Sequence, residues 1–235
     1  DGSVYRMVPD MVFYPKTLTD IQEAIKFANK VNLPIIPRTA GTSLAGQVVG
    51  KGIIVDVSKH FNRILHVDAV QKTVTVQPGV IRDQLNDYLK PHGLFFGPNT
   101  STSNRCMIGG MVGNNSSGTT SIKYGVTRDK VIQLKGFMSD GSPMTFKTLS
   151  KEEFFEKANT KSKEGKIYQT LYQILSNPEN KEEIKTRFPK KSIHRRNTGY
   201  AIDSLLDTEI FEDTDRPFNL CKLIAGSEGT LIFIT

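Results

Sequence analysis

Three segments built mainly of glycine, serine and threonine interrupt this chain, and each follows a short apolar run. They are TAGTSLAG (residues 39–46), IGGMVGNNSSG (residues 108–118) and AGSEGT (residues 225–230). Glycine lets a backbone approach a ligand closely, and successive backbone N–H groups can form a concave site for an anion. Any one segment taken alone is more simply an ordinary turn. Three of them in one chain favour ligand binding, and their chemistry suits a pyrophosphate.

The first segment joins two strands of a compact unit that ends near residue 58. The predicted strands lie at residues 11–15, 33–37 and 52–57. A helix is expected between the first two strands, where Thr19 and Gln22 stand at capping-box spacing. Its apolar stripe has helical period and consists of Ile21, Ala24, Ile25 and Ala28. Asn32 and Pro34 are expected to end the helix.

The rest of the chain, residues 59–235, reads as a second and larger unit. Its predicted strands lie at residues 63–68, 72–79, 130–141 and 142–149, and helices are expected at residues 80–93 and within 151–188. The last two strands form a hairpin that turns at Asp140 and Gly141. Residues 98–125 show little regular pattern, and residues 219–235 read as strand, turn and strand. The fold class is therefore α+β with two subdomains, residues 1–58 and 59–235.

Composition limits the classes of function. The formal net charge of +7 suits an anionic ligand, but it is too diffuse to name one. No apolar run approaches the roughly 20 residues of a membrane helix. Cys106 and Cys221 are too few for a zinc or iron–sulfur site and indicate free thiols in a reducing cytosol. We expect a cytoplasmic protein, or one peripheral to a membrane. Because the chain starts without Met and stops at the apolar run LIFIT, we also expect a further C-terminal domain.

The familiar phosphate-binding motifs do not fit this chain. The nearest candidate for a P-loop runs from Gly46 to Gly52, but its spacing is wrong and Gly52 follows Lys51. No strict GxGxxG follows a strand, and no acidic residue stands at the ribose position of a Rossmann unit. A cradle formed by the three segments is therefore of another kind.

A set of motifs resembles one family of flavin domains. In order, the motifs are PRTAGTSL, VQPGV, PHG, IGGMVGNNSSG with KYG, NTGY and GSEGTL. This order is similar to that of FAD-linked oxidases of the vanillyl-alcohol-oxidase/p-cresol-methylhydroxylase (PCMH) type, over nearly the whole chain. NRIL followed by GVIRDQLNDYLKPHGLFFGPNTSTSNR most resembles the long bacterial D-2-hydroxyacid dehydrogenases, the D-lactate, glycolate and D-2-hydroxyglutarate group. In those proteins the flavin domain precedes a cap domain and an iron–sulfur region.

The resemblance implies a PCMH-type FAD-binding domain with FAD between two α+β subdomains. The residues implied to wrap the FAD pyrophosphate through backbone N–H groups are Arg38, Thr39, Ala40, Gly41, Thr42, Ser43 and Leu44, preceded by Pro37. Side chains of Thr42 and Ser43 are implied to add hydrogen bonds, and Gly79 and Val80 to lie near the adenine. Family members that bind FAD covalently through histidine carry it where this chain has Thr42, so FAD is expected to be non-covalent.

Two further stretches are implied to run along the diphosphate, ribityl chain and isoalloxazine. They comprise Pro98, Asn99, Thr100, Ser101, Thr102 and Ser103, and then Ile108, Gly109, Gly110, Gly113, Asn114, Asn115, Ser116 and Gly118. Backbone contacts that close over the cofactor are implied for Gly226, Glu228, Gly229, Thr230, Ile232 and Phe233. Cys106 lies nearer the glycine pair than the second covalent attachment site of some members, so it is not expected to be a flavin link.

In the reaction that the resemblance implies, hydride leaves the substrate Cα for flavin N5 while a base takes the hydroxyl proton. In this family the base, the metal-binding histidines and the residue that anchors the substrate carboxylate come largely from the cap domain. The catalytic residues are therefore unknown in this chain. We expect this fragment to bind FAD and to turn over hydroxyacids poorly or not at all.

Two other interpretations remain open. A UDP-N-acetylenolpyruvoylglucosamine reductase shares this type of flavin domain, although GSEGTL and NTGY argue against it. A non-enzymatic basic module, for example for nucleic acid, is supported only by net charge and by the cluster Lys190, Lys191, His194, Arg195 and Arg196. That cluster is more simply a solvated basic face and lacks interleaved aromatic residues. The four histidines, His60, His66, His92 and His194, lack metal-ligand spacing, so no metal site is predicted.

Overall fold

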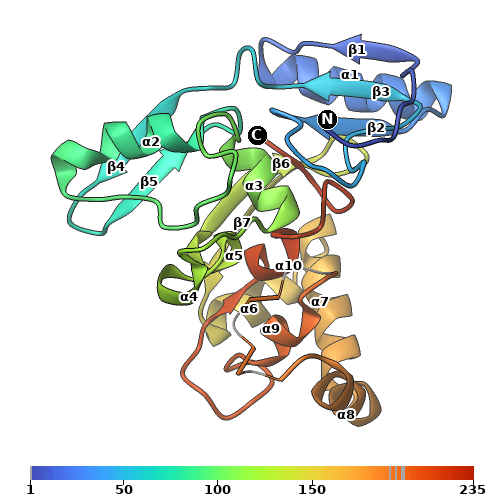
Figure 1. Ribbon diagram of the computed structural model, residues 1–235. Coiled ribbons are helices and arrows are strands. Elements are labelled where there is room, and N and C mark those ends of the chain that lie inside the picture. Colours follow the sequence, from blue (N-terminus) through green and yellow to red (C-terminus); the bar gives the residue numbers. More distant parts are fainter. Residues whose placement is uncertain (1, 191, 194, 197–198) are drawn as a thin grey trace.

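The computed structural model describes residues 2–190, 192–193, 195–196 and 199–235, and in this part of the chain three small sheets are joined by helices (Figure 1). The N-terminal sheet is parallel, with strand order β1-β3-β2. Its strands are β1 (Met11–Phe13), β2 (Ile35–Arg38) and β3 (Ile53–Asp56). Helix α1 (Leu18–Val31) connects β1 to β2. The predicted order of strand, helix, strand and strand is confirmed.

Helix α1 begins two residues earlier than the predicted capping box. Its N-cap is Thr17, whose side chain accepts a hydrogen bond from the N–H of Asp20, while the Asp20 carboxylate accepts from the N–H of Thr17. The predicted capping pair of Thr19 and Gln22 is wrong. Thr17 and Asp20 have the same spacing and lie two residues earlier, where the extended chain ends. Asn32 ends the helix in the left-handed conformation, as predicted.

The second sheet is an antiparallel hairpin at one side of the molecule (Figure 1). It consists of β4 (Ile64–Asp68) and β5 (Thr73–Val76). Helix α2 (Arg82–Leu89) follows and continues as a short 3-10 turn, η1 (Lys90–His92), which Gly93 ends with a φ of 68°. The predicted strands, helix and glycine stop are confirmed here.

The third sheet is antiparallel, with strand order β8-β7-β6-β9, and it anchors the larger part of the core. Its strands are β6 (Gln133–Phe137), β7 (Pro143–Leu149), β8 (Phe218–Asn219) and β9 (Phe233–Ile234). The helices of this part of the molecule are α6 (Lys151–Ala158), α7 (Lys163–Ser176), α8 (Pro178–Arg187), α9 (Ile202–Leu206) and α10 (Cys221–Ile224). Helix α6 contacts β7, whereas α8 contacts α7 and α9. The hairpin turn at Gly141 is confirmed, but α10 lies where the sequence indicated only strand and turn.

The glycine-rich tract is more regular than its composition indicated. It contains α3 (Ile108–Asn114) and α4 (Ser121–Tyr124), and α5 (Thr127–Lys130) follows directly. Glycine disfavours helix, so the prediction of an irregular stretch was wrong for a tertiary reason. The apolar side chains of Ile108, Met111 and Val112 are buried in the main core, and that burial outweighs the poor helix propensity of the glycines.

The N-terminal unit is fixed to the third sheet by both apolar and polar contacts. Ile21 and Ile25 of α1 belong to a core cluster that also includes Phe137 and Phe233 of β6 and β9. The Nε2 of Gln22 donates a hydrogen bond to the Gly141 carbonyl (2.8 Å), and the Nδ2 of Asn29 donates to that of Ser139 (2.7 Å). The division into subdomains 1–58 and 59–235 stays a prediction, and these contacts show that the two parts share one core cluster.

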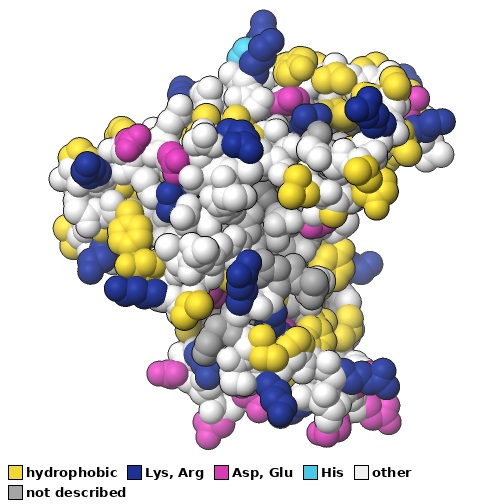
Figure 2. All heavy atoms as spheres, viewed as in Figure 1, with side chains coloured by type: hydrophobic (Ala, Val, Ile, Leu, Met, Phe, Trp, Pro, Cys, Tyr) yellow, Lys and Arg dark blue, Asp and Glu magenta, His cyan; other side chains and the backbone are white. Residues whose placement is uncertain are grey.

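The surface carries dispersed charge. Figure 2 shows Lys and Arg side chains spread over the face in view, while hydrophobic side chains form several separate groups, some of them over the N-terminal sheet. Both cysteines, Cys106 and Cys221, are buried free thiols. Among the described residues, no helix is long and apolar enough to cross a membrane.

Candidate cofactor site

The first small-residue loop leaves β2 with its backbone donors unused. Within the described part of the chain, none of the N–H groups of residues 39–44 donates a hydrogen bond to a protein acceptor. Gly41 has a φ of 63°, a left-handed conformation that favours glycine. Residues 39–43 are half-buried, so their unpaired donors are partly shielded from water. Such a run of donors is a ready binding site for an anion.

Arg38 places a positively charged guanidinium group against this loop. A Cβ added to Gly41 would lie 2.8 Å from the Nη2 of Arg38, so the guanidinium and the loop backbone are in contact. The Nε of Arg38 is buried and has no hydrogen-bond partner among the described residues. A buried polar group without a partner is costly, and a bound anion would supply the missing acceptor.

Helix α3 packs against the first loop through a glycine. A Cβ added to Gly110 would lie 2.6 Å from the Oγ1 of Thr39. Two N–H groups at the start of α3 are already used, since Ile108 donates to the Val80 carbonyl (2.9 Å) and Gly109 donates to that of Pro78 (2.8 Å). These bonds place Gly79 and Val80 beside the start of α3, and their position near the adenine stays a prediction.

The third loop closes onto α3 and onto the end of β2, just before the first loop. The N–H of Gly226 donates to the Val112 carbonyl and the N–H of Glu228 donates to the Gly113 carbonyl, each at 2.9 Å. The Nδ2 of Asn114 also donates to the Oε1 of Glu228 (3.2 Å). A Cβ added to Gly229 would lie 3.1 Å from Pro37, at the end of β2. The structure therefore brings the three small-residue segments together, although they are far apart in sequence.

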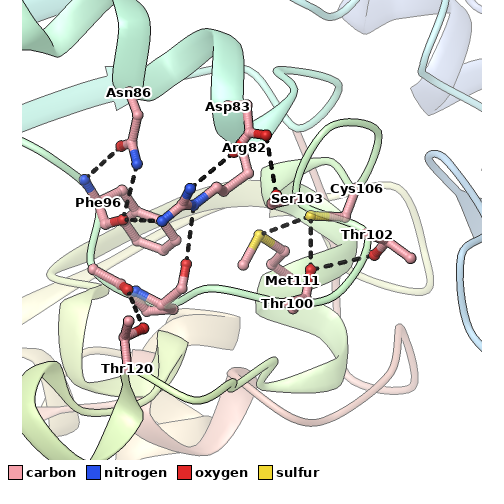
Figure 3. A network of polar contacts seen from close by, with 12 residues as sticks. Arg82, Asp83, Asn86, Phe96, Thr100, Thr102, Ser103, Cys106, Met111 and Thr120 are labelled. Carbon is pink, nitrogen blue, oxygen red and sulfur yellow. Dashed lines mark hydrogen bonds and ion pairs between the residues drawn. The ribbon is translucent and has the colours of Figure 1, made fainter.

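Residues 98–103 lie on a scaffold of side chains that the sequence analysis missed (Figure 3). Arg82 donates from Nε to the Pro98 carbonyl (3.1 Å) and from Nη2 to the Phe96 carbonyl (3.2 Å). Its Nη1 forms an ion pair with Asp83 (2.8 Å), and Asp83 accepts a further hydrogen bond from the Oγ of Ser103 (3.0 Å). The sequence signal that could have indicated this scaffold is the pair Arg82 and Asp83 at the start of α2, the helix before this loop.

Further contacts hold the same stretch from its other sides. The Thr120 hydroxyl donates to the Gly97 carbonyl (2.8 Å), and Gly118 crosses so close to Asn99 that an added Cβ would overlap the Asn99 carbonyl oxygen. The Oγ1 of Thr100 lies 3.2 Å from the Sγ of Cys106. These contacts fix the path of the segment before any ligand arrives.

A buried arginine, also missed from sequence, supports the third loop. Arg128 donates from Nε and Nη2 to the Ala225 carbonyl (3.1 and 2.7 Å), and its N–H donates to the Oδ1 of the fully buried Asn115 (2.8 Å). Lys222 donates to the Arg128 carbonyl (3.0 Å). Burial lowers the pKa of both Arg128 and Lys222, because removal from water disfavours their charged forms.

The other predicted residues divide by exposure. Val80, Ile108, Ile232 and Phe233 are buried core side chains, so only their backbones are available to a ligand in this arrangement.

In the NTGY motif, Asn197 and Thr198 lie outside the described residues, as do Lys191 and His194 of the basic cluster. The Tyr200 hydroxyl lies 2.6 Å from the Oγ1 of Thr230, and Arg195 donates to the Oγ of Ser117 (3.0 Å).

Residues 9–147 match the family described as FAD binding domain. The chain belongs to this FAD-binding family. It is 39% identical, over its full length, to the D-2-hydroxyglutarate dehydrogenases of Pantoea ananatis and of Escherichia coli. It is also 38% identical to the glycolate oxidase subunit GlcD of Bacillus subtilis over 58% of the chain and 29% of that relative. The chain spans 22% of the length of the first two relatives.

Solved structures of other proteins share the fold. A 6-hydroxy-D-nicotine oxidase from Arthrobacter nicotinovorans aligns over 63% of this chain and 32% of its own, with a TM-score of 0.53 and 20% identity. An alkyldihydroxyacetonephosphate synthase aligns over 58% of this chain and 28% of its own, with a TM-score of 0.51 and 24% identity. The PCMH-type fold and the FAD cofactor that the sequence predicted are confirmed.

The residues present fit FAD. Its pyrophosphate is an anion that needs donors, and the unused N–H groups of residues 39–44 and the unpaired Nε of Arg38 supply them. Gly110 leaves no side chain where α3 meets Thr39 of the first loop, and Gly41 leaves none against Arg38. FAD, when bound, supplies an acceptor for hydride, and this chain supplies the walls that hold it.

Proposed function

We propose that this chain is the FAD-binding part of a flavoenzyme that oxidises a D-2-hydroxyacid of the D-lactate, glycolate or D-2-hydroxyglutarate class. The observation that supports the proposal best is the meeting of three small-residue segments around donors without protein partners. The names of the relatives support the substrate class. The chain spans only about a fifth of the length of the first relatives, so the activity of the whole enzyme is part of what we propose.

In this proposal each wall has a separate role toward FAD. Residues 38–44 bind the pyrophosphate, with the hydroxyls of Thr42 and Ser43 adding to the backbone donors. Gly79 and Val80 lie near the adenine, while residues 98–103 and 108–118 run along the ribityl chain and isoalloxazine. Residues 226–230, with the backbone of Ile232 and Phe233, close over the cofactor. Thr42 leaves FAD without a histidine for covalent attachment.

The proposed reaction needs groups beyond these walls. Bound FAD would supply the acceptor, at flavin N5, for the hydride of the substrate Cα–H bond, and a base would take the hydroxyl proton. We assign the base and the residue that anchors the substrate carboxylate to a cap domain, and an iron–sulfur region to the longer protein. We place the protein in the cytoplasm and the FAD between subdomains 1–58 and 59–235.

The test is to purify the 235-residue chain and titrate it with FAD. Yellow protein that releases free flavin on denaturation, or a saturable change in flavin fluorescence, is expected. Flavin that stays attached to the denatured polypeptide would contradict non-covalent binding. Colourless protein that fails to take up FAD would contradict the proposal and favour a basic binding module. Rapid reduction of the flavin by D-lactate or D-2-hydroxyglutarate would show that the missing groups lie in this chain after all.

A further inference from the structure

An apolar cavity of about 440 Å³ lies between α7 and the third sheet, next to α10. Its apolar walls include Met138 and Phe146 from the β6–β7 hairpin, Leu223 and Ile224 at the end of α10, and Ile167 and Leu171 of α7. Small-molecule sites in proteins commonly have volumes of roughly 300–1,000 Å³ and mostly apolar linings. The cavity is therefore large enough for a ligand.

This cavity is separate from the proposed FAD walls. Of its lining residues, one, Ile232, is also in the predicted FAD set, and there its role is through the backbone. The Ile232 side chain instead packs against Gly136. A Cβ added to Gly136 would lie 3.0 Å from the Cδ1 of Ile232. The backbone and the side chain of Ile232 therefore serve different sites.

One face of α7 brings positive charge to the cavity. Lys163, Lys166 and Thr170 all line it and stand at helical spacing, so they lie along one stripe beside Ile167 and Leu171. Both lysines lie at the start of α7, where the helix dipole disfavours cations. Lys163 forms an ion pair with Asp140 (2.5 Å), and nearby Glu164 pairs with Lys157 (2.7 Å). Lys166 is exposed at the edge of the cavity and has no ion-pair partner within the described residues, so its ammonium is available to a ligand.

We propose that this cavity binds an aliphatic carboxylate of medium chain length, with the tail among the apolar walls and the carboxylate at Lys166. An extended polypeptide would bring backbone N–H and C=O groups that these walls cannot satisfy. A flexible hydrocarbon tail brings no polar groups, and its acid group matches the unpaired ammonium.

Calorimetric titration of the 235-residue chain with octanoate, nonanoate and decanoate tests the tail. Each added methylene should tighten binding about fourfold, since a buried methylene contributes roughly 0.8 kcal/mol. Absence of binding, or dissociation constants that do not depend on chain length, would overturn the proposal.

Substitutions test the head group and the location. Lys166→Gln should weaken decanoate binding about tenfold, as expected for loss of a charge-assisted hydrogen bond, and leave decan-1-ol binding unchanged. Lys161→Gln, which removes an exposed lysine outside the cavity lining, should bind decanoate like the wild type. Thr170→Phe fills the mouth from the exposed side and should abolish binding with little change in thermal stability. Wild-type affinity in Lys166→Gln or Thr170→Phe would contradict the assignment. Parallel FAD titrations keep this outcome distinct from failure of the proposed cofactor site.

Discussion

Two loops of the candidate site differ in whether their polar groups have partners within the protein. In residues 39–44 the backbone donors find no acceptor within the described chain, and the Nε of the neighbouring Arg38 is unpaired. In residues 98–103 the chain is held by protein partners, chief among them Arg82 (Figure 3). A loop that leaves donors unused at a half-buried position is suited to binding. A loop whose groups are satisfied internally is suited to holding a shape against which the ligand fits.

Gly118→Ala tests the held loop most severely. Because the added methyl group would overlap the carbonyl of Asn99, we expect a loss of about 4 kcal/mol in unfolding free energy, or failure to fold. Urea unfolding followed by circular dichroism measures it. The control is Gly113→Ala, where the nearest atom to the added Cβ is 3.9 Å away, and it should stay within about 1 kcal/mol of the wild type. Equal stability of the two variants would break the comparison.

Gly41→Ala tests the open loop. The left-handed φ and the contact with Arg38 should distort the donors, so FAD binding should weaken about 100-fold, which corresponds to roughly 2.7 kcal/mol. Flavin fluorescence titration gives the affinity, and stability should fall by only about 1–2 kcal/mol. Gly93→Ala is matched in backbone strain, with a φ of 68°, and lies outside the three loops. It should leave FAD affinity unchanged, and equal losses of affinity in both variants would contradict a specific role for the first loop.

Arg82→Ala removes the donors that hold residues 96–98. We expect a loss of about 2 kcal/mol in stability, because two backbone carbonyls and Asp83 lose a charged partner. FAD affinity should fall much less than in Gly41→Ala, and Arg82→Lys should recover part of the stability. A large loss of affinity at unchanged stability would instead show that this loop contacts the cofactor through Arg82.

Thr42→Val is the mildest change and sharpens the role of the first loop. Loss of one hydroxyl should weaken FAD binding about fivefold, since one neutral hydrogen bond contributes about 1 kcal/mol. Thermal stability should not change, because the hydroxyl has no partner among the described protein groups. Thr42→Ser retains the hydroxyl and should bind FAD like the wild type. Weakening of both variants alike would assign the effect to the lost methyl group or to shape.

Local sequence pattern predicted the regular elements well where period and turn chemistry agreed. The stripe of Ile21, Ile25 and Ala28 and the turn at Gly141 were sufficient for α1 and the β6–β7 hairpin. It failed for α3, where burial of apolar side chains in the core determines the secondary structure. The glycines of α3 predict an irregular segment, but its buried apolar residues stabilise a helix. The true N-cap at Thr17 could not be separated from Thr19 by spacing alone.

The sequence singled out the segments of the candidate site but not how they meet. Composition singled out three loops, and resemblance assigned them to FAD. That Gly110 contacts Thr39, and that Gly226 binds the Val112 carbonyl, depends on long-range packing that no spacing rule contains. Arg82 and Arg128 were missed because their acceptors are backbone carbonyls, which every residue has and which therefore leave no mark in the sequence.

The meeting of the first and third loops also sets an order of events during synthesis. A ribosome makes the donors of residues 39–44 early, whereas the backbone that closes against Pro37 comes at Gly229. Contacts between such distant residues form late, since the intervening chain must first be ordered. FAD capture should therefore follow the synthesis of Gly229, and nascent chains that stall before Gly226 should emerge without flavin.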